Sequence, residues 1–325
     1  MKIAIVGAGA IGGWLGVGLA RSGQEVSVFA RGVTREAIRQ RGLRLSIDGE
    51  TKTVIPPASD DASELGPQDL IIIAVKEPSL AAVAPAVAQM LQPETVVLPA
   101  MNGVPWWFAQ GLESPIAGMS LRSVDPDGSI AALLPTPQVL GCVVHASASV
   151  SEPGSIRHNS GNGLIIGEPD GRDTSRVRRV RDVLAAAGFD VTVSPQIQRD
   201  IWYKLWGNMT MNPISALTGA TTDCILDNPL VSAFVLAVMA EASDVGSRIG
   251  CPIAESGEDR MQVTRRLGAF KTSMLQDAEA GRPLEIDALL AAPREVAAAI
   301  GIATPHMDAL CGLIQLYQQH RLEKA

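Results

Sequence analysis

Three polar side chains recur at four-residue spacing in an otherwise apolar stretch of the chain. Lys204, Asn208 and Asn212 lie within DIWYKLWGNMTMNP, among tryptophan, leucine and methionine residues. If the stretch is one largely buried helix, the three fall at positions i, i+4 and i+8 and share one face. A buried ammonium is costly unless it is paired or functional, and it can give a proton to a carbonyl oxygen on which negative charge develops. Asparagine orients polar groups without titrating. The row therefore predicts a proton donor with two substrate-orienting amides.

The same spacing also fits a structural interpretation. Lys204 could extend to solvent at a helix edge while the two asparagines bond to loop backbone. Pro213, which follows the row directly, has no backbone N–H to donate. It predicts a kink or a break just after the polar row.

A glycine turn near the N-terminus predicts a dinucleotide site. Gly7, Gly9 and Gly12 in GAGAIG follow the strand-like KIAIV and precede a helical pattern. In this pattern the first glycine permits the tight turn, the second lets the backbone approach the pyrophosphate, and the third allows close packing of helix on strand. A glycine turn without a ligand is the alternative. The predicted cofactor contacts here are Gly7, Ala8, Gly9, Ala10, Ile11 and Gly12.

The end of the next strand indicates which dinucleotide binds. EVSVF is followed by Ala30, Arg31 and Gly32, with no carboxylate to hold the ribose hydroxyls of NAD. Arg31 can instead pair with a 2′-phosphate, which favours NADPH. FAD is disfavoured because flavin sites also place an acid here. A solvated loop arginine is the alternative for Arg31.

The surrounding elements predict how these residues are positioned. The apolar runs 70–76 and 95–103 are typical of parallel strands covered on both faces, and they end at Lys76 and at Asn102-Gly103. Ligands bind at that edge of open α/β sheets, so Lys76 and Asn102 are further candidate cofactor residues. The chain is also expected to form a hairpin at 43–55, strands at 139–150, 155–167 and 190–194, and a helix at 174–187.

After Pro195 the pattern is helical, and four groups of Gly, Pro and Asn divide it into about five helices. The predicted fold class is therefore α/β: an N-terminal Rossmann-type dinucleotide-binding domain followed by an all-α C-terminal domain. The predicted domains are 1–196, which binds NADP, and 197–325, which carries the substrate and catalytic residues. A chain of 325 residues exceeds what one core usually organises.

Charge and composition restrict the kinds of partner. The net charge of -7 provides no broad cationic field for nucleic acid or anionic lipid, and 46% hydrophobic residues favour thorough burial. A small-molecule partner is favoured, without nucleic acid or membrane. The longest apolar run, about 229–242, is short for a membrane span and is expected to be a buried helix.

The cysteines and histidines suggest no metal site. Cys142, Cys224, Cys251 and Cys311 are far apart and form no Cys/His cluster. They are expected to be reduced thiols of a cytoplasmic protein. Lysine and asparagine can polarise a carbonyl, so no metal is expected.

Taken together, these motifs resemble the ketopantoate reductase (2-dehydropantoate 2-reductase) family over essentially the full chain. The shared motifs are GAGAIG, Arg31, the lysine in AVKEPSL, MNG, YKLWGNMTMNP and TSMLQDAEAGRPLEID. The resemblance implies a C-terminal domain like that of 6-phosphogluconate dehydrogenase. It also implies NADPH-dependent reduction of ketopantoate to pantoate, a step of pantothenate and coenzyme A biosynthesis.

The resemblance also implies residue roles. Lys204 would donate a proton to the carbonyl oxygen, and Glu285 would interact with that lysine or with the cofactor. Asn208, Asn212 and Ser273 would hold substrate, while Lys76 and Asn102 would lie beside the nicotinamide and its ribose. As alternatives, Glu285 could be a first-turn acid of a helix and Ser273 an exposed serine.

Several positions depart from the family pattern. Phe270 and Thr222 replace asparagines, and Trp106, Trp107 and Phe108 add aromatic bulk that is expected to be packing. These changes leave open a divergent member that acts on another 2-oxo or 2-hydroxy acid. A noncatalytic NADP(H)-binding sensor is a third hypothesis, which the retained Lys204 disfavours. A homodimer formed through the apolar surface of the helical half is also expected.

Overall fold

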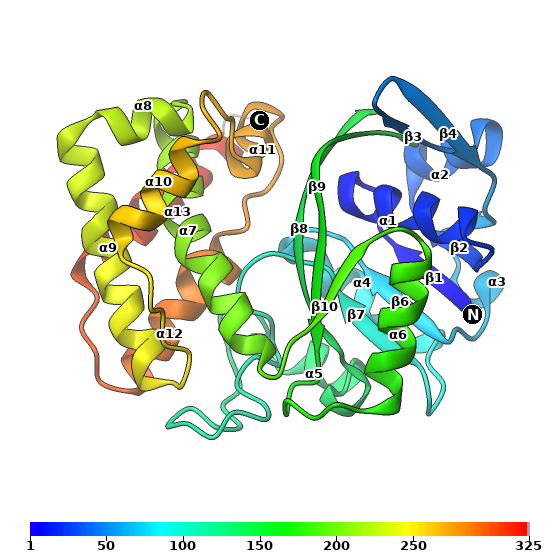
Figure 1. Cartoon of the computed structure of the whole chain (residues 1–325), viewed down its shortest axis with the longest axis horizontal. Helices are drawn as coiled ribbons and strands as arrows, with labels where there is room; N and C mark the ends of the chain where they lie inside the picture. Colours follow the sequence, from blue (N-terminus) through cyan, green and yellow to red (C-terminus); the bar gives the residue numbers. More distant parts are fainter. Residues whose placement is uncertain (324–325) are drawn as a thin grey trace. The chain divides into compact units, whose positions relative to one another are not determined.

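The structure is a computed structural model that describes residues 1–323, and in it the chain forms two compact units (Figure 1). Unit 1 comprises Met1–Met101 and Gly128–Ile197, and unit 2 comprises Asn102–Asp127 and the chain from Gln198 onward. Residues Asn102–Asp127 belong to unit 2 although they precede the predicted boundary after residue 196. The chain therefore passes between the units three times.

A parallel five-stranded sheet forms the centre of unit 1. Its order is β5-β2-β1-β6-β7, and every pairing is parallel. Apart from the exposed first residues Lys2 and Glu25, the residues of these strands are buried, because helices cover the sheet. Their carboxyl ends lie at one edge, so the residues that follow them come close together. The strands are β1 (Lys2–Val6), β2 (Glu25–Phe29), β5 (Ala58–Ser59), β6 (Leu70–Ile73) and β7 (Val96–Pro99).

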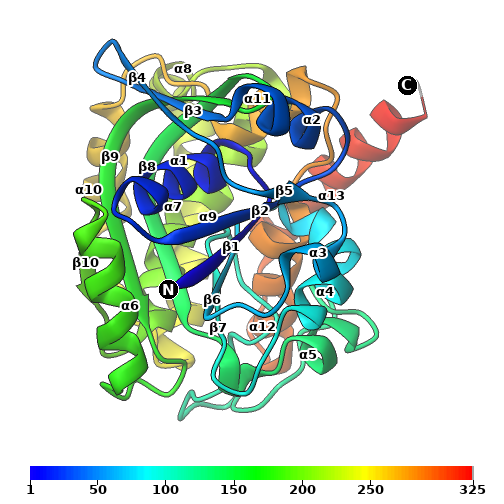
Figure 2. The ribbon, with the colours of Figure 1, turned by 90° about the vertical axis from the view of Figure 1, so that its right-hand side faces the viewer.

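A second sheet in unit 1 packs on the other side of helix α1 (Ala10–Arg21), which contacts strands of both sheets. Figure 2 shows the hairpin β3–β4 beside the long strand β9, with which β3 pairs. The predicted hairpin is confirmed: Asp48 and Gly49 form its turn, both with positive φ. The strands are β3 (Leu43–Ile47), β4 (Glu50–Val54), β8 (Gly141–Glu152), β9 (Ser155–Gly167) and β10 (Asp190–Val193).

The remaining helices of unit 1 are short. Thr174 is the N-cap residue of helix α6, because its hydroxyl accepts a hydrogen bond from the Val177 N–H. These helices are α2 (Gly32–Arg41), α3 (Ala62–Leu65), α4 (Leu80–Gln89), α5 (Ser129–Leu133) and α6 (Ser175–Ala186), with 3-10 turns at Glu77–Ser79 and Thr136–Gln138. The predicted Rossmann-type architecture is confirmed.

Every regular element among the described residues of unit 2 is a helix, as predicted for the C-terminal domain, whereas Asn102–Asp127 forms turns and irregular structure (Figure 1). It has more helices than the five expected, because Gly219 and Gly268 adopt left-handed conformations and separate α7 from α8 and α10 from α11. The helices are α7 (Ile197–Thr218), α8 (Thr222–Asp227), α9 (Pro229–Arg248), α10 (Gly257–Arg265), α11 (Ser273–Glu279), α12 (Ala292–Ala299) and α13 (Pro305–Leu322), with a π-helical turn at Asp287–Ala291.

Helix α7 carries the polar row and does not break at Pro213. It continues to Thr218, so a break, one of the two outcomes predicted there, does not occur, and a kink stays a prediction. Trp202, Leu205 and Met209 are at most 1% exposed. Ile214, after Pro213, is 5% exposed, so packed side chains hold the helix on both sides of Pro213 and the loss of one backbone hydrogen bond is tolerated.

The segment Asn102–Asp127 is fixed to unit 2 at two places. Val104 N–H donates to the carbonyl oxygen of Ala288 at 2.8 Å. The Glu295 carboxylate of α12 accepts from the backbone N–H groups of Arg122 and Ser123 at 2.9 and 2.8 Å. A carboxylate that accepts two N–H bonds is a strong anchor. The Val104 bond holds the start of the segment, and therefore Asn102, within unit 2, and the Glu295 bonds hold its other end.

Helix α9 is the single described helix that is long and apolar enough to cross a membrane by length and composition alone. One face of it is buried in unit 2, through residues such as Val235, Val238 and Ala242, while Leu230 is 82% exposed. Core helices of water-soluble proteins meet the same criterion, so the span is weakly supported. The predicted buried helix is correct for one face only.

All four cysteines are free thiols, and we expect Cys224 alone to react with iodoacetamide at pH 8. Cys224 is exposed, whereas Cys142, Cys251 and Cys311 are buried. Burial raises the pKa of Cys251 to about 12 and also raises the pKa of Cys311. The reactive thiolate forms above the pKa, so both groups stay protonated at pH 8. Mass spectrometry would find one label in the native protein and four in denaturant. Native labelling of a second cysteine at the rate of Cys224 would contradict the expectation.

Candidate active site

The glycine turn lies between the central strand β1 and helix α1, as the sequence predicts. Gly7 has φ of +93°, and a Cβ there would lie 2.7 Å from the Val75 side chain, which follows β6. A Cβ on Gly12 would overlap the carbonyl oxygen of Gly7. A Cβ on Gly9 would meet no atom within 4 Å. Gly7 and Gly12 therefore allow the close packing of the turn, while Gly9 leaves its outer surface open to a ligand.

The same turn exposes donors at a helix start. Helix α1 begins at Ala10, and no side chain caps it. Its first intrahelical bond runs from Gly13 N–H to the Gly9 carbonyl oxygen at 2.8 Å. The N–H groups of Ala10, Ile11 and Gly12 precede that bond, and such groups with the helix dipole favour a phosphate. Ala8 is buried beside them.

Arg31 lies directly after β2, where a 2′-phosphate would be expected. Its guanidinium donates to the carbonyl oxygen of Ala82 in α4 at 2.9 Å and lies 5.7 Å from the centroid of the Phe29 ring. Among residues 1–323, no carboxylate forms an ion pair with it. The side chain is exposed. The guanidinium is thus oriented by one bond and retains capacity for an anion.

Lys76 lies at the same sheet edge, after β6. It precedes the 3-10 turn Glu77–Ser79 and is half-buried. Val75, its neighbour, contacts the glycine turn at Gly7. Unit 1 therefore brings the glycine turn, Arg31 and Lys76 to the carboxyl edge of one sheet.

Unit 2 brings the predicted proton donor to one of the predicted cofactor residues. Lys204 Nζ donates to Asn102 Oδ1 at 2.8 Å, and both side chains are half-buried. Asn208 is half-buried and Asn212 is 7% exposed on the same helix. The ammonium is therefore held by a neutral amide oxygen, which fixes its position without removing its charge.

Glu285 and Ser273 lie in the same unit on other elements. Glu285 is 5% exposed and directly precedes the helical turn at Ile286. The segment that follows it accepts the Val104 N–H bond at Ala288, so Glu285 and Asn102 lie on two segments that are bonded together. Ser273 is the first residue of α11 and is half-buried, not fully exposed.

The departures from the family pattern have structural explanations in part. Thr222 N–H donates to the Phe270 carbonyl oxygen at 3.1 Å, and the Thr222 hydroxyl donates to the Gly268 carbonyl oxygen at 2.9 Å. This hydroxyl therefore serves a turn of the fold. Trp106 and Trp107 are 4% and 1% exposed, so the predicted packing role is confirmed.

One residue at this site was not predicted from the sequence. The guanidinium of Arg260 in α10 lies over the Tyr203 ring of α7, with Cζ 5.1 Å from the ring centroid. It also lies against Gly207, where a Cβ would be 2.8 Å from its terminal nitrogen. Residues 207 and 260 are far apart in sequence, and no local pattern signals their contact.

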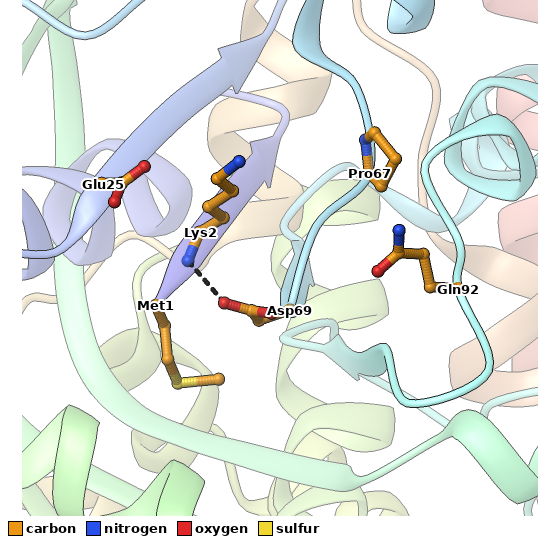
Figure 3. A pocket seen from close by; sticks show the side chains of 6 residues that line it. All are labelled: Met1, Lys2, Glu25, Pro67, Asp69 and Gln92. Atoms are coloured by element: carbon orange, nitrogen blue, oxygen red, sulfur yellow. Dashed lines mark hydrogen bonds between the residues drawn. The ribbon is translucent and has the colours of Figure 1, made fainter.

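A polar hollow of about 390 Å³ lies elsewhere in unit 1 (Figure 3). It is lined by residues at the amino-terminal starts of β1 and β2, and Lys2 N–H donates to Asp69 there at 2.8 Å. Ligands of open α/β sheets bind at the opposite, carboxyl edge. The hollow is therefore not the predicted site. Its lining residues are Met1, Lys2, Glu25, Pro67, Asp69 and Gln92.

The fold and these side chains define a class of protein: an oxidoreductase built from a Rossmann-type unit and an all-helical unit that carries a lysine. The family model "Ketopantoate reductase PanE/ApbA" matches residues 3–171, and the model "Ketopantoate reductase PanE/ApbA C terminal" matches residues 196–318. The chain belongs to the ketopantoate reductase family.

Individual relatives agree with this membership. The 2-dehydropantoate 2-reductase of Mesorhizobium japonicum is 40% identical over 316 residues, 97% of each chain. A solved structure from Ralstonia solanacearum MolK2, assigned as a ketopantoate reductase, is 54% identical with a TM-score of 0.95 and 98% coverage of each chain. The 2-dehydropantoate 2-reductase structure from Geobacter metallireducens is 27% identical with a TM-score of 0.85, covering 98% of this chain and 100% of that chain.

Proposed function

We propose that the protein reduces ketopantoate to pantoate with NADPH and that Lys204 supplies the proton. The observation that carries the proposal is the 2.8 Å hydrogen bond from Lys204 Nζ to Asn102 Oδ1, which holds an ammonium on the polar face of α7. The name of the Mesorhizobium japonicum relative supports the choice of substrate.

The residues of unit 1 fit the dinucleotide. The outer surface of the turn at Gly9 is free of side chains, α1 begins without a cap, and Arg31 has no carboxylate partner in the described chain. The turn would hold the pyrophosphate and Arg31 the 2′-phosphate. When bound, NADPH supplies the hydride that adds to the carbonyl carbon of the substrate. Lys76 and Asn102 are the proposed contacts for its nicotinamide ribose.

The residues of unit 2 complete the reaction. Lys204 donates a proton to the carbonyl oxygen, where negative charge develops, and later recovers a proton from water. Asn208, Asn212 and Ser273 orient the polar groups of the substrate through hydrogen bonds. Glu285 assists Lys204 or the cofactor from its buried position at the start of the helical turn.

The proposal is tested by following NADPH absorbance with purified protein and ketopantoate, beside a panel of other 2-oxo acids. Turnover with ketopantoate at the highest kcat/KM supports it. Faster turnover of another 2-oxo acid would favour the divergent member. The observations that favour it are Phe270, which replaces an asparagine, and the Thr222 hydroxyl, which donates to the Gly268 carbonyl oxygen. Tight NADPH binding without turnover of any acid would favour the sensor.

Arg31→Ala is expected to weaken NADPH binding by about 10- to 100-fold and to leave NADH binding nearly unchanged. Charge-assisted hydrogen bonds contribute about 1.5–3 kcal/mol, and the 2′-phosphate is the group that NADH lacks. Fluorescence titration of both cofactors measures the effect. Arg41→Ala, at the exposed far end of the same helix α2, is the control. Equal losses for both cofactors, or unchanged NADPH affinity, would refute the 2′-phosphate role.

The homodimer and the cytoplasmic location stay predictions. Leu313 and Leu316 on α13 and Leu230 on α9 are more than half exposed, which supports association through this part of unit 2. Sedimentation equilibrium would measure the mass of the assembly. A monomer at all concentrations would contradict the dimer.

A further inference from the structure

Arg260 presents a positive charge on the flank of the polar row of α7. Its guanidinium is pressed against Gly207, where a Cβ would lie 2.8 Å from one terminal nitrogen and 3.0 Å from Nε. Its Cζ lies 5.1 Å from the centroid of the Tyr203 ring. Only glycine at position 207 lets the guanidinium approach the helix this closely. The side chain is therefore placed against α7 by two residues of that helix.

The guanidinium of Arg260 stacks on Tyr203, whose hydroxyl bonds to Glu255, but it has no ion-pair partner of its own in the described part of the chain. Among residues 1–323 no carboxylate forms an ion pair with its guanidinium, and its buried Nε has no hydrogen-bond partner. The nearby Tyr203 hydroxyl donates to the Glu255 carboxylate. Burial and this bond raise the pKa of Tyr203, so its ring stays neutral at physiological pH. Nε of Arg35 and of Arg44 also lacks a partner, but both of those arginines form ion pairs with carboxylates.

The position of Arg260 relates it to the predicted chemistry. Gly207 lies three residues after Lys204 and directly before Asn208. At about 100° per residue, the face of Gly207 is only about 60° from that of Lys204. The guanidinium therefore lies on the side of α7 next to Lys204, whereas Asn208 lies about 100° around the helix from Gly207.

We propose that Arg260 binds the carboxylate of the 2-oxo acid and selects charged acids over neutral ketones. This inference rests on the proposed function, because it assigns the anionic group of the same substrate. A 2-oxo acid carries its carboxylate directly on the reacting carbonyl carbon. Asparagine and serine are neutral, whereas a guanidinium pairs with a carboxylate through two parallel bonds. Gly207 serves as a positioning residue by leaving room for the guanidinium.

The test compares ketopantoate with ketopantoyl lactone, its uncharged cyclic ester, as substrates of wild type and Arg260→Met. We expect the KM for ketopantoate to rise about 10- to 100-fold, with kcat within about threefold, while the kinetics with the lactone change less than about twofold. Arg260→Lys should recover part of the ketopantoate affinity, because lysine restores the positive charge but cannot donate the two parallel hydrogen bonds of a guanidinium. Arg266→Met, an exposed arginine at the end of α10, is the matched control.

A second variant separates binding from folding. Gly207→Ala keeps Arg260 but places a methyl group against its guanidinium, so it should also raise the KM for ketopantoate more than that for the lactone. If Arg260 only stacks on Tyr203, both substrates would lose affinity equally, or neither would, and the inference is overturned.

A binding experiment keeps this inference distinct from the proposed function. If wild type reduces neither ketopantoate nor the lactone, calorimetry with oxamate and NADPH measures carboxylate binding directly. Oxamate binding to wild type that is lost in Arg260→Met would support the carboxylate site although the proposed reaction fails. Equal binding to both proteins, or no binding to wild type, would overturn the inference.

Discussion

Replacing Lys204 with alanine is expected to lower kcat for ketopantoate reduction by about 10²- to 10⁴-fold, the usual contribution of a positioned general acid. The ammonium is held at 2.8 Å by Asn102 Oδ1, so its loss removes both the proton and the positive charge near the developing alkoxide. Because the charge acts mainly in the transition state, kcat and kcat/KM should fall together. Steady-state kinetics with ketopantoate measure both parameters.

The control for this prediction is another lysine of unit 2. Lys271 is about half exposed and pairs with Glu279, so Lys271→Ala should keep kcat within about twofold. NADPH affinity of Lys204→Ala should remain close to that of wild type, because the glycine turn and Arg31 lie in unit 1. A Lys204→Ala enzyme that keeps more than a tenth of the wild-type kcat would exclude this lysine as the proton donor.

The second large effect is expected at the glycine turn. Gly12→Ala should weaken NADPH binding by about 100-fold or more and lower the stability of unit 1 by about 1–3 kcal/mol. The new methyl group would overlap the Gly7 carbonyl oxygen and lie 3.0 Å from Ala74 Cβ, so α1 must move away from β1. Fluorescence titration and thermal unfolding measure the two effects.

Gly9→Ala provides a matched comparison within the same turn. A Cβ at Gly9 meets no protein atom within 4 Å, so the melting temperature should stay within about 2 °C of wild type. NADPH affinity should nevertheless fall, since the methyl group occupies the surface that the pyrophosphate approaches. If Gly9→Ala binds NADPH as tightly as wild type, the turn is not the pyrophosphate site.

The parts of the structure that follow from local sequence pattern were predictable. The strand, glycine turn and helix from Lys2 to Arg21 were predicted because their spacing encodes both the turn and the burial. The hairpin at Asp48-Gly49 and the single face shared by Lys204, Asn208 and Asn212 follow from local geometry in the same way.

Features that depend on distant contacts were not predictable. The sequence around Val104 contains no signal that it bonds to Ala288, and nothing near Gly207 indicates that Arg260 packs on it. Of the kink or break expected at Pro213, the break does not occur for a related reason, because tertiary packing of α7 outweighs a local preference. The short helices α8 and α11 were not predicted as separate helices, because they are separated from α7 and α10 by the left-handed residues Gly219 and Gly268.

The placement of Asn102–Asp127 in unit 2 has a consequence for how the protein is made. A ribosome releases this segment well before α7 and α12, the helices of the unit into which it packs. Trp106, Trp107 and Phe108 are buried in the folded unit. On the nascent chain they are therefore exposed until the helices that cover them have been synthesised. During that interval this aromatic cluster exposes apolar surface that favours aggregation. Co-translational chaperone contact should therefore concentrate on residues 104–108.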